Sequence, residues 1–223
     1  MSPVRKLLGF SCRLGLILGL LIVPWPGLNG WYARGFRATG NFLFGSFWAK
    51  GLVKFQSHPQ ADGDLMDTDV MVANRETLRP DGSALATYYS FNCRHIGYVP
   101  TVMVIAVILS TPVSWRRRAW ALCWGMLLVH VFLGFLLAIM LLTLAASHEW
   151  LGLFPFNSFW RKVVFGLNKI FIFYEGARLS VPVFIWMVVA FRREDWVKNI
   201  GEGTGSNRKL QKGQFIMRRA RPK

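Results

Sequence analysis

Four long apolar blocks divide the sequence. They cover residues 7–23, 97–114, 119–146 and 170–191. Within each block the apolar residues follow one another, without the spacing of three to four residues that marks an amphipathic helix. At about 1.5 Å per residue, each block is long enough to cross about 30 Å of hydrocarbon. The pattern predicts an α-helical multi-pass membrane protein with about four transmembrane helices.

The first block is preceded by Arg5 and Lys6 and followed by Pro24, Trp25 and Pro26. A cleaved signal peptide is the competing interpretation of such a segment. No cleavage site of the small-x-small type follows the apolar run, so we expect a retained helix.

The basic residues predict the orientation of the chain. Arg5 and Lys6, the run 116–118, and the tail from Arg192 fall on one side of the membrane if there are four crossings. The tail alone carries ten Lys or Arg against three acids. Because basic residues favour the cytoplasmic side, we expect a protein of the cytoplasmic (inner) membrane with both termini in the cytoplasm. The expected organisation is 1–29 N-terminal helix, 30–96 extracytoplasmic insert, 97–193 transmembrane helices and 194–223 basic tail.

The insert is expected to have two parts. Residues 31–55 mix aromatic and basic side chains, which is typical of a segment at the membrane interface. Residues 69–73 and 85–91 are predicted strands, joined through the turn signal at 79–82. A small β-hairpin is therefore predicted. Six acids lie in or beside it, but their spacing is not that of an EF-hand loop, so a solvated loop is the expectation and no metal site is predicted.

The composition agrees with a membrane protein, since 53% of the residues are hydrophobic and 17% are charged. The net charge of +16 would also suit a nucleic-acid-binding protein. Most of this charge, however, lies beside apolar blocks or in the last 32 residues, so no nucleic-acid partner is expected. The three cysteines form neither a disulfide framework nor a CxxC zinc pattern. No phosphate-binding loop is present, and no cofactor is implied.

One part of the sequence resembles a known family. The run Pro100-Thr101-Val102 is followed by Ile105-Ala106 and then by the segment 112–118, which ends in Trp115 and three arginines. From residue 95 to about 191 the chain resembles the exosortase and archaeosortase family. These are multi-pass membrane cysteine enzymes that process proteins carrying a C-terminal sorting signal. The resemblance implies that exported proteins with such signals, together with the lipid bilayer, are the partners.

The family's catalytic residues are replaced or displaced in this sequence. Aligned on Pro100, the family's Cys falls at His95, whereas the cysteine of this chain, Cys93, stands two residues earlier. The family's Asn and Arg fall at Leu133 and Leu136, and its closing His falls at Arg178. The resemblance therefore implies Cys93, His95 and Arg178 as candidate catalytic residues with a degenerate pattern.

Helix geometry tests whether these positions can share a depth. His95 is expected about 30 Å above Trp115, Leu136 about 27 Å above Arg118, and Arg178 about 21 Å above Arg192. All three positions would thus lie near the outer boundary of the bilayer. A membrane transpeptidase needs such a shared depth.

A cysteine nucleophile also needs a lowered pKa and a nearby base. Arg94 and His95 adjoin Cys93, while His148 and Glu149 begin the second outer loop. An inert thiol remains the competing interpretation of Cys93.

Two further features of the apolar blocks attract attention. His130 is expected near the membrane midplane, facing a polar cavity or a neighbouring helix, and a structural role is favoured over a functional one because no partner is evident. Glu175 and Arg178 share a helix face, and we expect them to form a pair, with the lining of a cleft as the alternative.

These observations predict a catalytically degenerate, exosortase-like membrane protein that handles exported proteins at the outer face of the membrane. An active membrane cysteine transpeptidase or protease using Cys93 is the first alternative. A non-catalytic membrane assembly subunit is the second.

Overall fold

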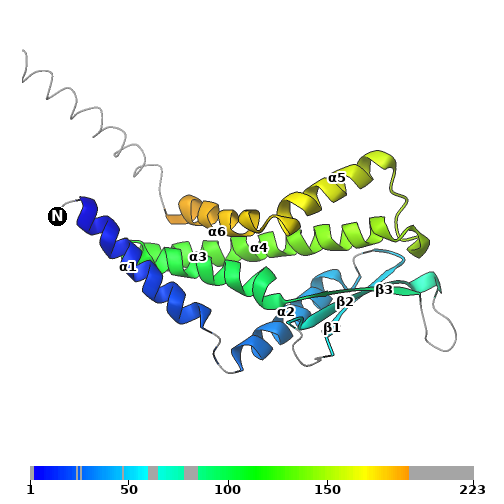
Figure 1. Cartoon of the computed structure of the whole chain (residues 1–223), viewed down its shortest axis with the longest axis horizontal. Coiled ribbons are helices and arrows are strands. Elements are labelled where there is room, and N and C mark those ends of the chain that lie inside the picture. The colour runs from blue at the N-terminus through cyan, green and yellow to red at the C-terminus, as the bar shows by residue number, and fades with distance from the viewer. Residues whose placement is uncertain are drawn as a thin grey trace, which may run out of the picture.

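The computed structural model describes residues 3–23, 25, 27–46, 48–59, 65–77 and 85–190. Two structural units are visible in these residues, a helical bundle and a small sheet with its own helix (Figure 1). The helices are α1 (Pro3–Ile22), α2 (Leu28–Phe44), α3 (Val99–Ser110), α4 (Trp115–Ser147), α5 (Ser158–Asn168) and α6 (Glu175–Ala190). The strands are β1 (Gly51–Ser57), β2 (Thr68–Asn74) and β3 (Ala86–Phe91).

The bundle is built around α3, which packs against α1, α4 and α6. Its core contains branched and small side chains, namely Val104, Ile108, Ala121, Val129 and Ile185. The absence of a side chain at Gly125 allows α3 and α4 to approach closely. A Cβ atom at this position would lie 2.7 Å from Cδ1 of Ile108 and 3.0 Å from Cγ1 of Val104. Small residues are typical of such close helix contacts.

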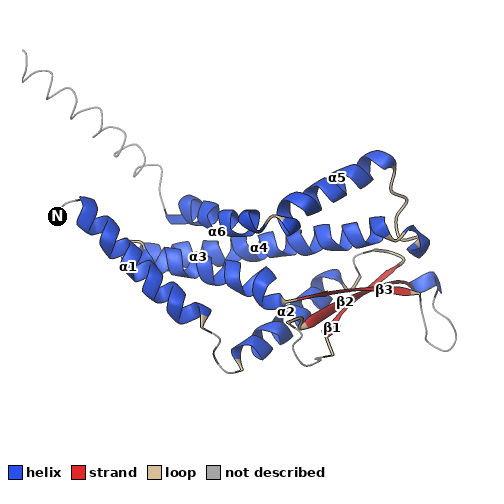
Figure 2. Cartoon of the chain, in the orientation of Figure 1, coloured by secondary structure: helices blue, strands red, loops and turns tan. Residues whose placement is uncertain are grey.

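The sheet is antiparallel with strand order β1-β2-β3 (Figure 2). Phe55 lies opposite Val70, which in turn lies opposite Tyr89. Residues that lie directly opposite each other in neighbouring strands have their side chains on the same face of the sheet, so these three side chains share one face. That face carries the buried residues Val53, Phe55, Val70, Val72 and Phe91, which form a common core with α2 and α4.

Helix α4 connects the two units. It has 33 residues, so it extends over about 50 Å. Its N-terminal part packs in the bundle, and Leu137, Leu141 and Leu144 near its C-terminal end belong to the core of the sheet unit. Just beyond α4, the Asn74 side-chain amide donates a hydrogen bond of 2.8 Å to the carbonyl oxygen of Leu151. The sheet is thereby held against the end of α4.

The segment between β3 and α3 holds the end of α1. The Tyr98 hydroxyl donates a hydrogen bond of 2.6 Å to the carbonyl oxygen of Leu21, and the Arg94 guanidinium donates one to that of Ile22. The last carbonyl groups of a helix have no partner within the helix, and a cation is favourable at this end. These two contacts therefore satisfy and neutralise the C-terminus of α1.

Several predicted elements are confirmed and others are corrected. The predicted strands 69–73 and 85–91 correspond to β2 and β3, which pair antiparallel. The turn at 79–82 lies outside the described residues. The block 170–191 does not form one helix, because the chain passes through a π-helical turn (Lys169–Phe173) and is extended at Tyr174 before α6 begins. The insert is also more than a hairpin, since it includes α2 and a third strand, β1.

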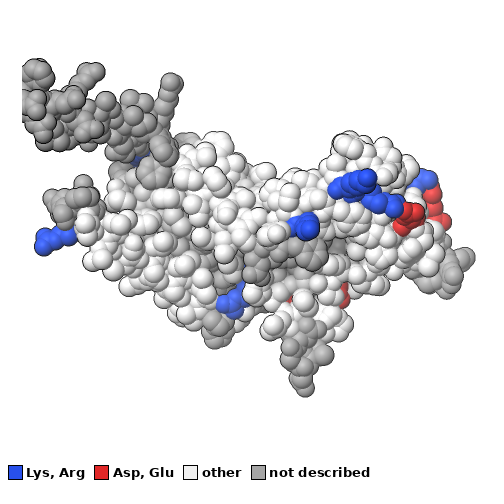
Figure 3. All heavy atoms as spheres, turned by 45° about the horizontal axis from the view of Figure 1, so that its top comes forward, with Lys and Arg blue, Asp and Glu red and all other residues white. Residues whose placement is uncertain are grey.

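One helix among the described residues, α4, is both long and apolar enough to cross a membrane. Shorter apolar helical segments cover Leu7–Ile22, Arg94–Ser110 and Leu179–Ala190. Large apolar side chains on the outside of the bundle are exposed, and few charged groups interrupt the face of the molecule drawn in Figure 3. The exposed side chains include Leu7, Leu16, Trp120, Trp124, Leu127, Val131, Phe184 and Val188.

Candidate functional site

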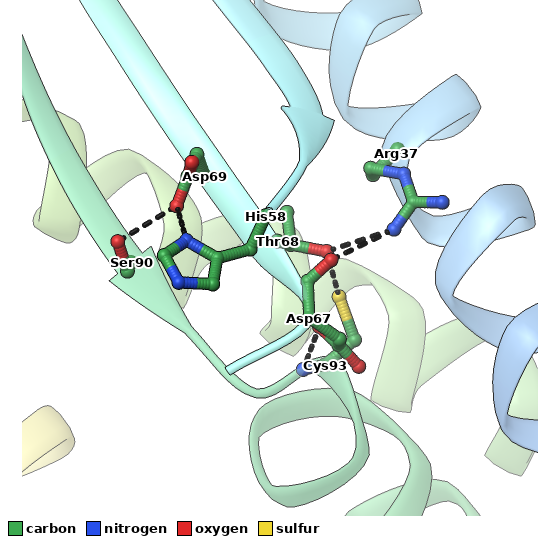
Figure 4. Close-up of polar contacts among 7 residues, drawn as sticks. All are labelled: Arg37, His58, Asp67, Thr68, Asp69, Ser90 and Cys93. Atoms are coloured by element: carbon green, nitrogen blue, oxygen red, sulfur yellow. Dashed lines mark hydrogen bonds and ion pairs between the residues drawn. The ribbon is translucent and has the colours of Figure 1, made fainter. Parts of the chain in front are cut away.

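Polar side chains gather at the end of the sheet where β1 and β3 finish and β2 begins (Figure 4). One member comes from α2, two come from β2, and the others follow β1, precede β2, lie in β3 or follow it. The cluster consists of Arg37, His58, Asp67, Thr68, Asp69, Ser90 and Cys93. We call this set the polar cluster.

Cys93 and Thr68 are the most enclosed members of the polar cluster. The Cys93 side chain is fully buried, and its Sγ lies 3.0 Å from Oγ1 of Thr68. The Cys93 backbone N–H donates a hydrogen bond of 3.0 Å to Oδ1 of Asp67. Burial raises the pKa of the thiol from 9.0 to about 12, and the nearby Asp67 acts in the same direction, while Thr68 and Arg37 partly oppose the rise. The environment of Cys93 therefore favours the neutral thiol.

Arg37 connects α2 to the sheet. Its Nη1 donates hydrogen bonds to the carbonyl oxygen of Asp67 (3.0 Å) and to Oγ1 of Thr68 (3.3 Å). The guanidinium thus contacts the Thr68 hydroxyl, which in turn contacts the thiol. It does not itself bond to Sγ in the described structure. A hydrogen bond that involves a charged group is stronger than one between neutral groups. Arg37 therefore fixes the position of Thr68 over Cys93.

His58 and Asp69 form the second half of the polar cluster. Nδ1 of His58 lies 2.6 Å from Oδ1 of Asp69, and the Ser90 hydroxyl donates a hydrogen bond of 2.7 Å to the same oxygen. In a serine nucleophile site the hydroxyl bonds to the imidazole, which accepts its proton. Here the hydroxyl bonds to the carboxylate instead, and Figure 4 shows the other ring nitrogen of His58 pointing away from Cys93. This arrangement orients the imidazole without activating Ser90 or Cys93.

A polar pocket of about 390 Å³ opens beside the polar cluster. Three of its lining residues, Arg37, His58 and Asp67, have ionisable side chains. The remaining lining residues are Asn29, Gly30, Ala33 and Ser57. Cys93 does not line it. The pocket offers hydrogen-bond donors and acceptors to a polar group, and the thiol is screened from it.

The described structure does not bring the side chains of Cys93 and His95 together, and it does not describe that of Arg178. Cys93 is buried, whereas His95, two residues later, has an exposed side chain and no hydrogen bond to Cys93. Arg178 belongs to α6, but its side chain lies outside the described residues. The catalytic assignment of these residues stays a prediction, and the burial and raised pKa of Cys93 speak against a nucleophilic role.

The positions of the family's Asn and Arg are apolar and buried. Leu133 and Leu136 are 4% and 2% exposed. Leu136 borders a cavity of only about 10 Å³ between the start of α3, α4 and the turn before α6. Its other lining residues are Ile96, Leu137, Met140, Phe171 and Ile172. A cavity of this size and polarity has no room for a peptide bond, so the helices converge there through apolar packing.

The other histidines also lie away from Cys93. Nδ1 of His148 lies 3.0 Å from the carbonyl oxygen of Leu144, and its Nε2 lies 3.3 Å from Oγ1 of Thr87. Thr87 is four residues before Phe91 on β3, which places it about 13 Å along the strand from the Cys93 end. The Glu149 carboxylate pairs with Arg161 rather than with a catalytic group. The suggested role of His148 and Glu149 as a base for Cys93 therefore has no geometric support.

The expectation that His130 faces a cavity or a neighbouring helix is wrong for the described residues. Its side chain is exposed, and its Nδ1 lies 2.7 Å from the carbonyl oxygen of Met126 in the preceding turn. A histidine bonded to its own helix is compatible with a structural role. The side chain of Glu175, like that of Arg178, is outside the described residues, so the predicted pair stays a prediction.

Arg37, His58, Thr68 and Asp69 were not predicted as members of a site. His58 reaches Asp69 because β1 and β2 pair in one register, with the hydrogen bond from the His58 N–H to the Asp67 carbonyl oxygen closing the end of the ladder. Arg37 reaches Thr68 because α2 packs on the sheet. The available signal was a lone histidine after an apolar-polar alternation, with aspartates at the start of the next predicted strand. No match to the chain is found among protein-family models, curated proteins or solved structures.

Proposed function

We propose that this chain is an exosortase-like integral membrane protein that has lost the cysteine chemistry and that holds exported polypeptides at the outer face of the cytoplasmic membrane. The observation that carries the loss of chemistry is the full burial of Cys93 beneath Thr68. A thiol whose pKa is about 12 is almost entirely protonated near neutral pH, and the thiolate is the reactive form.

The outer surface of the bundle supports the membrane part of the proposal. Leu16 on α1, Val131 on α4 and Val188 on α6 are 71%, 62% and 73% exposed. Full burial of one such side chain in an apolar phase stabilises by about 1.5–3 kcal/mol, and soluble monomers rarely present many of them together. From residue 119 to 147 the sequence contains no Asp, Glu, Lys or Arg. Along this stretch of α4 a bilayer would therefore meet no permanently charged side chain.

The length of α4 agrees with an extracytoplasmic sheet unit. A helix of about 20 residues spans the hydrocarbon core, and α4 has 33 residues. Counted from the three arginines at 116–118, the crossing would end near Leu137. Beyond this point α4 contributes Leu141, Leu144 and Ala145 to the core shared with the sheet. In this proposal one helix anchors the protein in the bilayer and also supports the sheet above it.

The test compares two cysteine variants in the native host. Cys93→Ala removes the thiol of the polar cluster, and Cys123→Ala removes an exposed cysteine of α4 as a matched control. We expect exported proteins with C-terminal sorting signals to keep their processing pattern in both variants, since Cys93 performs no chemistry. Loss of processing in Cys93→Ala alone, at unchanged protein level, would establish the enzyme alternative and contradict the proposal.

A further inference from the structure

The two edges of the sheet differ in whether their backbone groups are used. In an antiparallel pair, alternate residues direct both N–H and C=O toward one neighbour, and the residues between them direct both groups the other way. The His58 N–H bonds to the Asp67 carbonyl oxygen, and the Arg75 N–H bonds to that of Lys50. These bonds fix which residues of β1 face β2, so Phe55 directs its backbone groups away from the sheet.

The edge at β1 is closed by a side chain. The Asn41 amide donates a hydrogen bond of 2.9 Å to the carbonyl oxygen of Phe55, and the Asn41 side-chain oxygen accepts one of 2.7 Å from the Phe55 N–H. Asn41 thus occupies the place of a neighbouring strand's backbone. Helix α2, which carries Asn41, packs along β1. A further strand cannot pair at Phe55.

The edge at β3 has no such closure among the described residues. Because Phe55 faces outward, Val70 faces β3 and pairs with Tyr89. It follows that Tyr88 and Ser90 direct their backbone N–H and C=O groups away from β2. No hydrogen bond of these four groups occurs within the described part of the chain. The side chains of Leu85, Tyr88 and Tyr89 at this edge are also exposed.

We propose that the open edge of β3 binds an extended segment of another polypeptide, which adds to the sheet as a fourth strand. Alternating donors and acceptors at strand spacing are complemented by an extended backbone and by few other ligands. β3 carries no charged residue, so the matching segment is uncharged, with β-branched or aromatic side chains that pack beside Tyr88 and Tyr89.

The direction of β3 indicates which part of a partner protein would supply the added strand. The C-terminal end of β3 leads through Cys93 into α3, which belongs to the bundle. An added strand would therefore point toward or away from the helical bundle. If the bundle spans the membrane, the occupant is the stretch of an exported protein next to its own membrane helix. This last step rests on the proposed function, whereas strand addition at β3 does not.

The experiment uses disulfide trapping in detergent, with the full chain in a Cys12→Ser/Cys123→Ser background that keeps the buried Cys93. Tyr88→Cys places a thiol on β3, and Lys54→Cys is the matched control. Lys54 and Tyr88 lie in one row across the sheet, on either side of Met71, and both are exposed. The probe is a short synthetic peptide of alternating Thr and Val with one central Cys. A second probe has the same sequence with N-methyl groups on alternate residues, which removes its backbone donors on one edge.

We expect the Tyr88→Cys variant to trap the unmethylated peptide at least about tenfold faster than it traps the methylated peptide. The Tyr88→Cys variant should also trap the unmethylated peptide at least about tenfold faster than the Lys54→Cys variant does. This factor is what the loss of two backbone hydrogen bonds predicts.

Two results would overturn the proposal. Equal trapping of both peptides by the Tyr88→Cys variant would mean that side chains alone attract the probe. Disulfide-linked dimers of this variant that form faster than its peptide adducts would mean that the occupant is a second copy of the chain. The measurement needs no membrane, so it is independent of the bilayer part of the proposed function.

Discussion

The thiol of Cys93 lies in surroundings that oppose its ionisation. Apolar neighbours remove it from water, and the carboxylate of Asp67 disfavours a second negative charge nearby. Arg37 acts in the opposite direction, but its hydrogen bonds go to Thr68 and to the backbone of Asp67. At the scale of single residues, the polar cluster therefore resembles a structural network more than an activated nucleophile.

The reactivity of Cys93 provides a direct test. We expect iodoacetamide at pH 8 to alkylate the exposed thiol of a Tyr88→Cys variant, while Cys93 stays unmodified until the chain is unfolded. Peptide mass spectrometry of the detergent-solubilised protein measures each site separately. Alkylation of Cys93 in the folded chain at the rate of the exposed thiol would contradict its burial.

The raised pKa also predicts a pH dependence of stability. Between about pH 9 and 12 the unfolded chain releases the Cys93 proton while the folded chain retains it, so the free energy of unfolding falls as the pH rises. Below about pH 9 both the folded and the unfolded chain hold the proton, so the contribution of this thiol to the free energy of unfolding is fully present and no longer changes with pH. Denaturant unfolding of the wild type and Cys93→Ala at pH 8 and pH 10.5 should show a smaller loss in the variant. Equal losses would contradict this assignment.

Among the elements, the contact between α3 and α4 depends on one glycine. Gly125→Ala would force a methyl group against Ile108 and Val104, and overpacking of this kind costs about 1–3 kcal/mol. Gly134→Ala is the matched control, because a Cβ there has no neighbour within 4 Å. We expect thermal unfolding in detergent to show a lower midpoint for Gly125→Ala. For Gly134→Ala we expect the free energy of unfolding to change by less than about 1 kcal/mol. Equal effects of the two substitutions would contradict the close approach of these helices.

Local sequence patterns predicted some elements well. The apolar blocks located α1, α3 and α4 to within several residues, and the alternation of Val70, Val72 and their neighbours located β2. These signals are local, because the spacing of apolar residues along the chain indicates whether an element is buried on one side or on all sides. Helix α2 was not predicted, since it contains several glycines and mixes aromatic with basic residues. Its packing of Tyr32 and Phe36 against the segment before α3 is a tertiary effect.

The polar cluster could not be predicted for a related reason. His58 and Asp69 meet only because β1 and β2 adopt one register, and Arg37 reaches Thr68 only because α2 packs on the sheet. Such contacts depend on residues far apart in the chain. Cys93 attracted attention because of its neighbours in sequence, but its neighbours in space keep it protonated. The family resemblance likewise pointed to two positions of α4 where the family has catalytic side chains. In this chain they are Leu133 and Leu136, and both are buried.

At the scale of the whole molecule, one long helix, α4, joins an apolar bundle to a sheet unit. The bundle exposes large apolar side chains, while the sheet unit holds the polar cluster and the open edge of β3. In the proposed arrangement the bilayer covers the first unit and leaves the second in water outside the cell. The proposed function and the proposed origin of the fourth strand both depend on this division, so the position of each unit relative to the membrane is the central claim.

Single-cysteine labelling in intact cells tests this claim most directly. Because Cys93 is buried, Tyr88→Cys reports on the sheet unit, and Val131→Cys reports on the middle of α4, both in a Cys12→Ser/Cys123→Ser background. We predict that a membrane-impermeant maleimide labels the Tyr88→Cys variant from outside the cell. The Val131→Cys variant should stay unlabelled even after permeabilisation, because lipid surrounds its thiol. Labelling of Tyr88→Cys only after permeabilisation, or rapid labelling of Val131→Cys by the aqueous reagent, would contradict the account.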